Sequence, residues 1–412
     1  MNGAHCCDRI VVAQLGAREH YSVARMCHAA GCLARMHTDF WCPMPRSIRG
    51  LLHHAAGNSG RRILGRHHDD IPSGRVVHHS LPAAYWQLRL WAASNRAEAY
   101  DIHRRWGTHF ARRVASALIR DEPSTYFGFA SASYEALRAA KALGALAVLD
   151  EVAPTHLEDE IAQGEQQRFA GWEPTERPTP RSFLDRIERE WEVADRIIVN
   201  SHWTRKALVR QGVAPAKIHI VPPAYTPPHQ AITTKSRRPN EPLKVLWLGT
   251  LCLRKGIGHA LEAARRLRGL PVTFTFAGPT TINLAEVEWP DNASYLGQVP
   301  RVDVDKLWGD HDIFLLPTLS DGFAMTQLEA VAHGLALVVT PNCGEVVEEG
   351  RNGLRVAPRD PGAIVDAITK FLDGQVGLEC ASRHAVATAA HFSPERVWPQ
   401  LHAVLSREQA AI

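Results

Sequence analysis

The chain has 412 residues, of which 45% are hydrophobic and 22% charged, so it is long enough for two or three globular domains. Its formal net charge of +4 is modest, which argues against nucleic acid as a partner. No apolar run has the length of a membrane-spanning helix and the first eight residues hold no apolar signal segment, so we expect a cytoplasmic protein. The eight cysteines include no Cys-x-x-Cys pair, and we expect reduced, mostly buried thiols.

The arginines are unevenly distributed along the chain. Between Arg46 and Arg120 there are thirteen arginines, no lysine and only four acids. A solvated, partly helical face would explain this bias. The alternative is a basic patch that contacts anionic lipid headgroups or an anionic acceptor, because the guanidinium group binds phosphate well. On that second interpretation the protein lies peripherally on the inner face of the membrane.

The first half alternates apolar runs with helical patterns, as in a doubly wound α/β domain. Residues 9–14 predict the first strand, and Gly16 marks the turn after it. Residues 43–82 show little periodicity, so we expect loops and short helices there, followed by one or two amphipathic helices over 83–120. Further strands are expected at 126–130, 145–149, 196–200 and 218–221, with helices at 21–30, 134–143, 154–167, before 194 and at 204–211.

Six prolines between residues 222 and 242 indicate a linker. Beyond it, strands are expected at 243–248, 272–277, 313–317 and 336–340, a weaker one at 295–296, and helices at 260–267, 304–308, 364–372 and 394–405. The predicted organisation is a first domain over 1–222, a linker over 223–242, a second domain over 243–390, and a C-terminal helix within 391–412 that packs back toward the first domain. Two such domains would face each other across a central cleft.

Two carboxylates, Asp321 and Glu329, stand eight residues apart between the last two predicted strands. A glycine turn follows Asp321, and a helical pattern runs into Glu329. Ligands bind in the loops after the strands of a parallel sheet, and a helix N-terminus suits a phosphate. Because carboxylates accept hydrogen bonds from hydroxyl groups, the segment is typical of a nucleotide-sugar site.

A basic glycine turn, Gly249-Thr-Leu-Cys-Leu-Arg254-Lys255-Gly256, follows the first strand of the second half. It is not a Walker loop, because no Gly-Lys-Ser/Thr ends it. A surface turn would explain its two cations. However, this turn and Asp321 both lie at the carboxyl edge of one predicted sheet, so the turn could hold a diphosphate while the carboxylates hold the sugar and ribose.

These two motifs resemble those of the family 4 retaining glycosyltransferases, which have the GT-B fold, a Glu-x7-Glu signature and a glycine turn ending in Lys-Gly. The resemblance covers residues 193–353 and includes the glycine-rich stretch at 342–353. It implies two Rossmann-like domains and transfer of a hexose-type sugar from a UDP- or GDP-sugar to a glycan, a lipid-linked sugar or a small acceptor. Because Asp321 replaces the family's first Glu, a nucleotide-sugar-binding protein with weak or no transfer activity is the alternative.

The resemblance also assigns site residues. Asp321 would contact the sugar hydroxyls and Glu329 the ribose hydroxyls, while Lys255 and Arg254 would bind the diphosphate. The other implied donor positions are Gly249, Thr250, Gly278, Val299, Gly322, Phe323, Ala324 and Met325.

On the first half, Gly16 marks the acceptor-side loop. His156 is our choice for a catalytic group there, and Asp150 or Glu151 is the alternative. In this family the protein mainly positions the reactants and stabilises the leaving diphosphate.

Two acidic clusters raise the question of a metal. Asp303-Val-Asp305 resembles the Asp-x-Asp pair of another transferase class, but it opens a predicted helix, where capping is a simpler role. His67-His-Asp-Asp70 lies in a predicted loop and gives thin support for a metal site. We therefore expect neither a metal nor any other cofactor.

Overall fold

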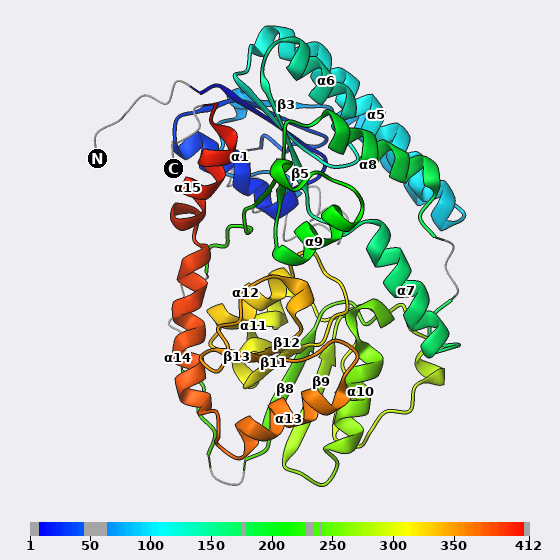
Figure 1. The fold of residues 1–412 in the computed structure, drawn as a ribbon, viewed down its shortest axis with the longest axis vertical. Coiled ribbons are helices and arrows are strands. Elements are labelled where there is room, and N and C mark those ends of the chain that lie inside the picture. Colours follow the sequence, from blue (N-terminus) through cyan, green and yellow to red (C-terminus); the bar gives the residue numbers. More distant parts are fainter. Residues whose placement is uncertain (1–7, 45–63, 175–177, 228–233, 239–240, 408–412) are drawn as a thin grey trace.

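The computed structural model describes residues 8–44, 64–174, 178–227, 234–238 and 241–407. They form two parallel β-sheets with helices on their faces, one sheet in each half of the chain (Figure 1). The predicted α/β fold with two doubly wound halves is confirmed. Arg46, Arg49, Arg61 and Arg62 of the predicted basic patch lie outside the described residues.

The first sheet has the strand order β3-β2-β1-β4-β5-β6-β7. Its strands are β1 (Ile10–Gln14), β2 (Leu33–Thr38), β3 (Val76–His78), β4 (Thr125–Phe129), β5 (Leu146–Glu151), β6 (Arg196–Val199) and β7 (Ile218–Ile220). The accompanying helices are α1 (Ser22–Ala29), α4 (Ser80–Trp91), α5 (Arg96–Asp121), α6 (Tyr134–Ala142), α7 (His156–Arg168), α8 (Arg181–Val193) and α9 (His202–Arg210). Alternate residues of β1 enter two separate cores, because successive side chains of a strand point to opposite faces.

The second sheet has the order β10-β9-β8-β11-β12-β13. Its strands are β8 (Leu243–Leu248), β9 (Val272–Ala277), β10 (Ala293–Tyr295), β11 (Ile313–Leu316), β12 (Ala336–Val339) and β13 (Gly353–Arg355). The helices are α10 (Ile257–Arg266), α11 (Arg301–Asp310), α12 (Met325–Ala332), α13 (Pro361–Leu372), α14 (Leu378–Ala389) and α15 (Pro394–Leu405). In both sheets the order reverses beside the first strand, which is where parallel sheets bind ligands.

The strand β2 was expected only as a short element of unspecified type beginning at residues 33–36, and three further elements, β3, β13 and α14, were not predicted from the sequence. The strands β3 and β13 have only three residues each, too few to show a period. The helix α14 was missed because its buried face consists of small residues, among them Ala381, Ser382, Ala385 and Ala389. Such a face packs closely without the large apolar side chains that mark a helix in a sequence.

The end of the chain returns to the first half. The helices α14 and α15 run along one side of both sheets (red in Figure 1). Val397, Leu401 and Leu405 of α15 belong to a core of the first sheet. The hydroxyl of Thr125 in β4 donates to the carbonyl of Leu405 at 2.8 Å. The last helix is therefore part of the first half's packing.

A second connection between the halves is made by α7, which follows β5 but contacts the second half (Figure 1). The buried Glu165 carboxylate accepts from His259 Nε2 at 2.9 Å and pairs with Arg359 Nε at 2.6 Å. The ring of Phe169 would lie 2.4 Å from a Cβ added to Gly258, so this position of α10 has no room for a side chain. These contacts hold the first half against the start of α10.

No helix among the described residues has the length and apolar character needed to cross a membrane.

Candidate functional site

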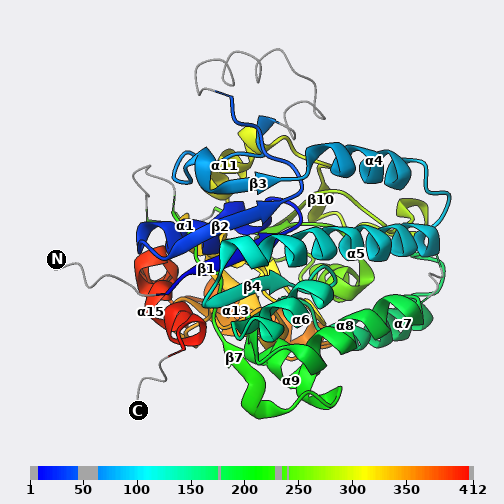
Figure 2. The same ribbon diagram turned by 90° about the horizontal axis from the view of Figure 1, so that it is seen from above.

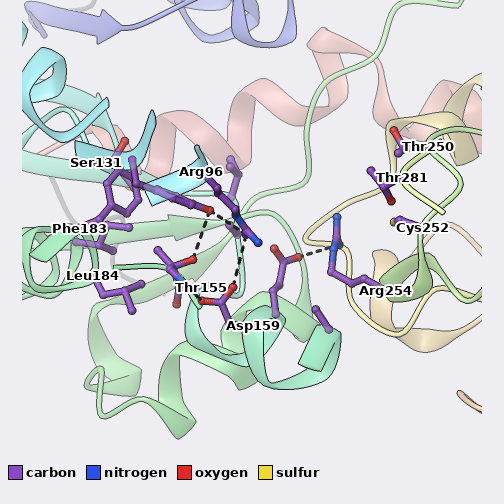
Figure 3. A pocket seen from close by; sticks show the side chains of 18 of the residues that line it. Arg96, Ser131, Thr155, Asp159, Phe183, Leu184, Thr250, Cys252, Arg254 and Thr281 are labelled. Atoms are coloured by element: carbon purple, nitrogen blue, oxygen red, sulfur yellow. Dashed lines mark hydrogen bonds and ion pairs between the residues drawn. The ribbon is translucent and has the colours of Figure 1, made fainter. Parts of the chain in front are cut away.

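A cavity of about 640 Å³ lies between the two halves and is lined by both (Figure 3). The first half contributes Arg18 after β1, Ser131 after β4 and Glu151 at the end of β5, and the second contributes Arg254 and Lys255 after β8. The carboxyl ends of strands from both sheets thus meet at one cavity. Its volume is in the range of small-molecule sites, about 300–1,000 Å³.

The basic turn is fixed by close backbone packing. Arg254 and Lys255 belong to the 3₁₀ turn η4 (Leu253–Lys255), which ends at Gly256 with a φ of +82°. A Cβ on Gly256 would lie 2.1 Å from the carbonyl oxygen of Pro317, so only glycine fits there. The predicted donor positions Gly249 and Gly278 also touch, because a Cβ on Gly278 would lie 2.1 Å from the Gly249 oxygen.

The structure brings together Lys255 of the basic glycine turn and Asp321, the first of the two paired carboxylates. Lys255 Nζ lies 3.2 Å from Asp321 Oδ2, and both side chains are 19% exposed. Asp321 is placed by its own amide, which donates to the carbonyl of Asn342 at 2.9 Å. The ion pair therefore joins the turn after β8 to the loop after β11.

The loop that follows Asp321 is pressed against the first half. A Cβ on Gly322 would lie 1.8 Å from the carbonyl oxygen of Val152, and Ser201 Oγ donates to the Gly322 carbonyl at 2.6 Å. Phe323 is buried and packs on Phe392, at 5.9 Å between ring centroids. Gly322 thus helps to form the junction between the halves, whereas Phe323 packs into a core of the second half.

The helix α12 begins at Met325 without a side-chain cap. The Ala324 amide, one of the predicted donor contacts, already donates to the carbonyl of Cys343 at 3.0 Å. Glu329 lies further along α12 and is half-buried. Burial raises its pKa, and the nearby Arg301 partly offsets this effect.

The predicted donor positions differ in their relation to the cavity. Thr250, Arg254 and Lys255 line it, whereas neither Asp321 nor Glu329 is among its lining residues. The same holds for Gly249, Gly278, Val299, Gly322, Phe323, Ala324 and Met325. These residues stay predictions for a donor that would extend beyond this cavity.

On the first half, Glu151 faces the cavity and His156 does not. Glu151 accepts from Trp191 Nε1 at 3.0 Å and from the Ala153 amide at 3.3 Å, and burial raises its pKa to about 8. His156 instead places Nε2 2.9 Å from Glu188 Oε1 on α8. Asp150 lines a smaller pocket, and burial raises its pKa.

The acceptor-side loop after β1 has an unusual backbone. The Gly16 amide donates to Asp39 Oδ1 at 3.0 Å. Three successive residues after it, Glu19, His20 and Tyr21, have positive φ angles of 48°, 50° and 63°, which non-glycine residues rarely adopt. Strained loops of this kind are concentrated at functional sites. Gly16 itself does not line the cavity, but Arg18 of the same loop does.

Several further lining residues were not singled out from the sequence, among them Arg18, Arg96, Tyr100 and Glu158. Arg96 donates to the Tyr100 hydroxyl at 3.2 Å and lies 3.9 Å from Asp159 (Figure 3). The position of Arg18, two residues beyond Gly16 in a loop after a strand, was a usable signal. Arg96 and Tyr100 gave none, because they lie on a helix whose orientation depends on tertiary packing.

Neither acidic cluster provides a metal-binding group in the described part of the chain, where no set of three or more His, Cys, Asp or Glu side chains is arranged to hold a metal ion. Asp303 lies in the first turn of α11, and Asp305 lies 3.7 Å from His333. His67 Nδ1 lies 3.3 Å from Asp69 Oδ1, and His68 Nδ1 lies 3.5 Å from Asp70 Oδ2.

Residues 242–374 match the family model described as Glycosyl transferases group 1. The amylovoran biosynthesis glycosyltransferase AmsK of Erwinia amylovora is 25% identical over 224 residues, which cover 50% of this chain and 54% of AmsK. The chain spans about half the length of the curated relatives it matches first.

Two solved structures cover nearly the whole fold. Sucrose-phosphate synthase from Thermosynechococcus elongatus superposes with a TM-score of 0.64 at 14% identity, over 96% of this chain and 98% of that one. Anabaena HepE in complex with UDP-glucose gives a TM-score of 0.56 at 14% identity, over 97% and 100%. The chain therefore has the GT-B fold, and residues 242–374 of its second half are similar to the glycosyl transferases group 1 family.

Proposed function

We propose that this chain is a retaining glycosyltransferase that moves a hexose-type sugar from a nucleoside diphosphate sugar to a glycan, a lipid-linked sugar or a small acceptor. The observation that carries the proposal is the ion pair between Lys255 of the basic turn and Asp321. The match of residues 242–374 to the glycosyl transferases group 1 model supports it. So does the set of relatives named as glycosyltransferases, AmsK among them.

The proposed donor position follows from the charges of the basic turn and of the two carboxylates. Lys255 and Arg254 would neutralise the diphosphate, while Asp321 would bind sugar hydroxyls and Glu329 the ribose. The HepE structure with UDP-glucose favours a uridine nucleotide over a guanosine nucleotide. Because the leaving diphosphate gains charge as the glycosidic bond breaks, cations at this turn would stabilise the transition state more than the ground state.

The acceptor is proposed to enter from the first half. That wall of the cavity carries hydroxyl, guanidinium and carboxylate groups, which suit a ligand rich in hydroxyls. Glu151 is the proposed acid–base group there, in place of His156, because it lines the cavity and its pKa of about 8 lies close to neutral pH. AmsK, named for the biosynthesis of a polysaccharide, favours a glycan or lipid-linked acceptor.

Incubation with a panel of sugar nucleotides, with release of the nucleoside diphosphate as the readout, tests this function. The second candidate is a nucleotide-sugar-binding protein without transfer activity. It is favoured by Asp321, whose side chain is one methylene shorter than the glutamate in the family's signature. Binding without release in the presence of any acceptor would support this second candidate.

We also infer that the first half contacts an anionic membrane through α4. Four large apolar side chains on one face of this helix are exposed: Leu81 by 87%, Tyr85 by 52%, Leu88 by 66% and Trp91 by 86%. Their spacing of three or four residues places them on one stripe. The other side of α4 packs on α5, where Trp86 lies 6.3 Å from His109.

The positive charge of α4 and α5 favours anionic lipid as the partner of the exposed apolar stripe. Residues 80–121, which cover α4 and α5, contain seven arginines and three acids. The two helices lie side by side (Figure 2). A Trp and a Tyr on the apolar stripe are the residues that prefer the membrane–water interface, and the inner leaflet carries the anionic lipids.

Replacing Leu88 and Trp91 together by serine should lower binding to anionic vesicles by at least about 10-fold, because two exposed apolar side chains no longer enter the interface. Co-sedimentation with vesicles of phosphatidylglycerol and phosphatidylcholine measures the effect. Serine at the exposed Leu270 and Leu296 of the second half is the matched control and should leave binding unchanged. Equal wild-type binding to neutral and anionic vesicles at low salt would contradict the inference. A dimer dissolved by the same double substitution would show that a second copy covers this face.

A further inference from the structure

Both cations of the basic turn are already paired with carboxylates. Lys255 pairs with Asp321 of its own half. Arg254 Nη1 lies 3.1 Å from Glu158 Oε1, and Glu158 comes from α7 of the first half (the ion pair is drawn at Arg254 in Figure 3). The charges that would bind a diphosphate are therefore compensated within the chain.

The Arg254–Glu158 pair is held in a defined geometry. Arg254 Nη1 also donates to the carbonyl of Ser320, and Ser320 Oγ donates to Glu158 Oε1 at 3.4 Å. Both side chains line the cavity and are about one quarter exposed, at 28% for Arg254 and 25% for Glu158. The guanidinium thus faces the cavity with a carboxylate on one side and a carbonyl on the other.

The helix that carries Glu158 cannot move away freely. Two turns along α7, Glu165 is bonded to His259 and Arg359 of the second half. Beyond α7, Glu173 accepts from the amide of Leu253, in the basic turn itself, at 3.0 Å. A diphosphate bound to Arg254 would therefore lie close to the Glu158 carboxylate.

We propose that Glu158 is a positioning residue that holds Arg254 in the cavity when no donor is bound, releases it to the donor's diphosphate, and weakens donor binding while it carries a negative charge. This inference rests on the proposed function. The inference goes beyond the proposed function because it states that Glu158, a residue of the first half, sets the affinity for the donor that the second half binds.

The charged groups around Glu158 give the proposal a pH dependence. Glu158 pairs with Arg254 from η4 and interacts electrostatically with Asp321 from the loop after β11 and with its neighbour Asp159 on α7. Asp321 is itself paired with Lys255. Burial raises the pKa of Glu158, Arg254 lowers it, and Asp321 raises it. A bound diphosphate would raise it further, so the complex would bind more protons than the free protein. Donor affinity should then fall as the pH rises through this range.

The test is calorimetric titration of UDP-glucose, with GDP-mannose and ADP-glucose as alternative nucleotides, between about pH 5.5 and 8, where a diphosphate diester does not titrate. Glu158→Gln keeps the size of the side chain and removes its charge. It should bind the sugar nucleotide about 3- to 10-fold more tightly than wild type at the upper end of this range, because one nearby negative charge is removed from a partly screened site. Its affinity should vary less with pH than that of wild type.

Two further variants separate this role from a merely structural one. Glu160→Gln removes a charge from the same helix, but Glu160 pairs with Arg210 through side chains that are 60% and 65% exposed, so wild-type behaviour is expected. Glu158→Asp keeps the charge and should keep the pH dependence. Unchanged affinity and unchanged pH dependence in Glu158→Gln would overturn the inference alone. A wild-type protein that binds none of the three sugar nucleotides would overturn the proposed function as well.

Discussion

Lys255→Ala is expected to lower kcat/KM for the sugar nucleotide by about 10²- to 10³-fold, the loss typical for removal of one group that stabilises a transition-state charge. Lys255 lines the cavity, where its ammonium group, paired with Asp321 at 3.2 Å, would also contact the leaving diphosphate of a bound donor. Its loss should reduce kcat as well as donor affinity. The measurement is steady-state release of the nucleoside diphosphate at varied donor concentration.

The matched control is Lys370→Ala, which removes an exposed lysine from α13. This variant should turn over donor at the wild-type rate. If Lys255→Ala retained wild-type kcat/KM, the basic turn would not be the diphosphate site. The Glu158 inference would then lose its basis too, because Arg254 belongs to the same turn.

Asp321→Asn should distinguish contacts to the sugar of the donor from contacts to its nucleoside diphosphate. We expect about a 10²-fold loss in kcat/KM, because an amide replaces a charge-assisted acceptor of sugar hydroxyl groups. Affinity for the free nucleoside diphosphate should stay equal or rise, since Lys255 loses its carboxylate partner and becomes free to bind phosphate. Turnover assays together with calorimetric titration of UDP and GDP measure both effects.

An equal loss of affinity for UDP-sugar and for UDP would contradict a role of Asp321 at the sugar. Asp303→Asn on α11 is the control, because it removes an exposed acid of the second half that lies outside the cavity lining. Asp321→Glu restores the family's side chain. Higher turnover in that variant would mean that the shorter carboxylate limits the natural enzyme.

The positions of the site residues in the second half could be predicted from the sequence, because they depend on short, local motifs. The strand at 313–317 and the helix that follows fix where Asp321 lies, and the glycine turn fixes where Lys255 lies. Both loops belong to one parallel sheet, so their proximity followed from the expected topology. The 3.2 Å contact between the two side chains agrees with that expectation.

The site residues of the first half were harder to predict from the sequence, because the rotation of each helix about its axis and its packing determine which side chains face the cavity. Thr155 has a φ of +49°, and α7 starts directly after it with His156 turned toward Glu188. Glu158, one half-turn further on, faces the cavity instead. No local sequence pattern specifies the positive φ of Thr155, which sets how α7 begins. The Arg254–Glu158 contact joins residues 96 positions apart and depends on how the two halves dock.

The measurement that tests the central claim most directly is nucleoside diphosphate release by the wild-type chain from a panel of UDP-, GDP- and ADP-sugars, with and without glycan and lipid-linked acceptors. The proposed function predicts release from one preferred nucleotide that is faster with an acceptor and about 10²- to 10³-fold less efficient in Lys255→Ala. The transferred sugar should keep its anomeric configuration in the product. Absence of both binding and release across the whole panel would contradict the assignment of this cleft as a sugar-nucleotide site.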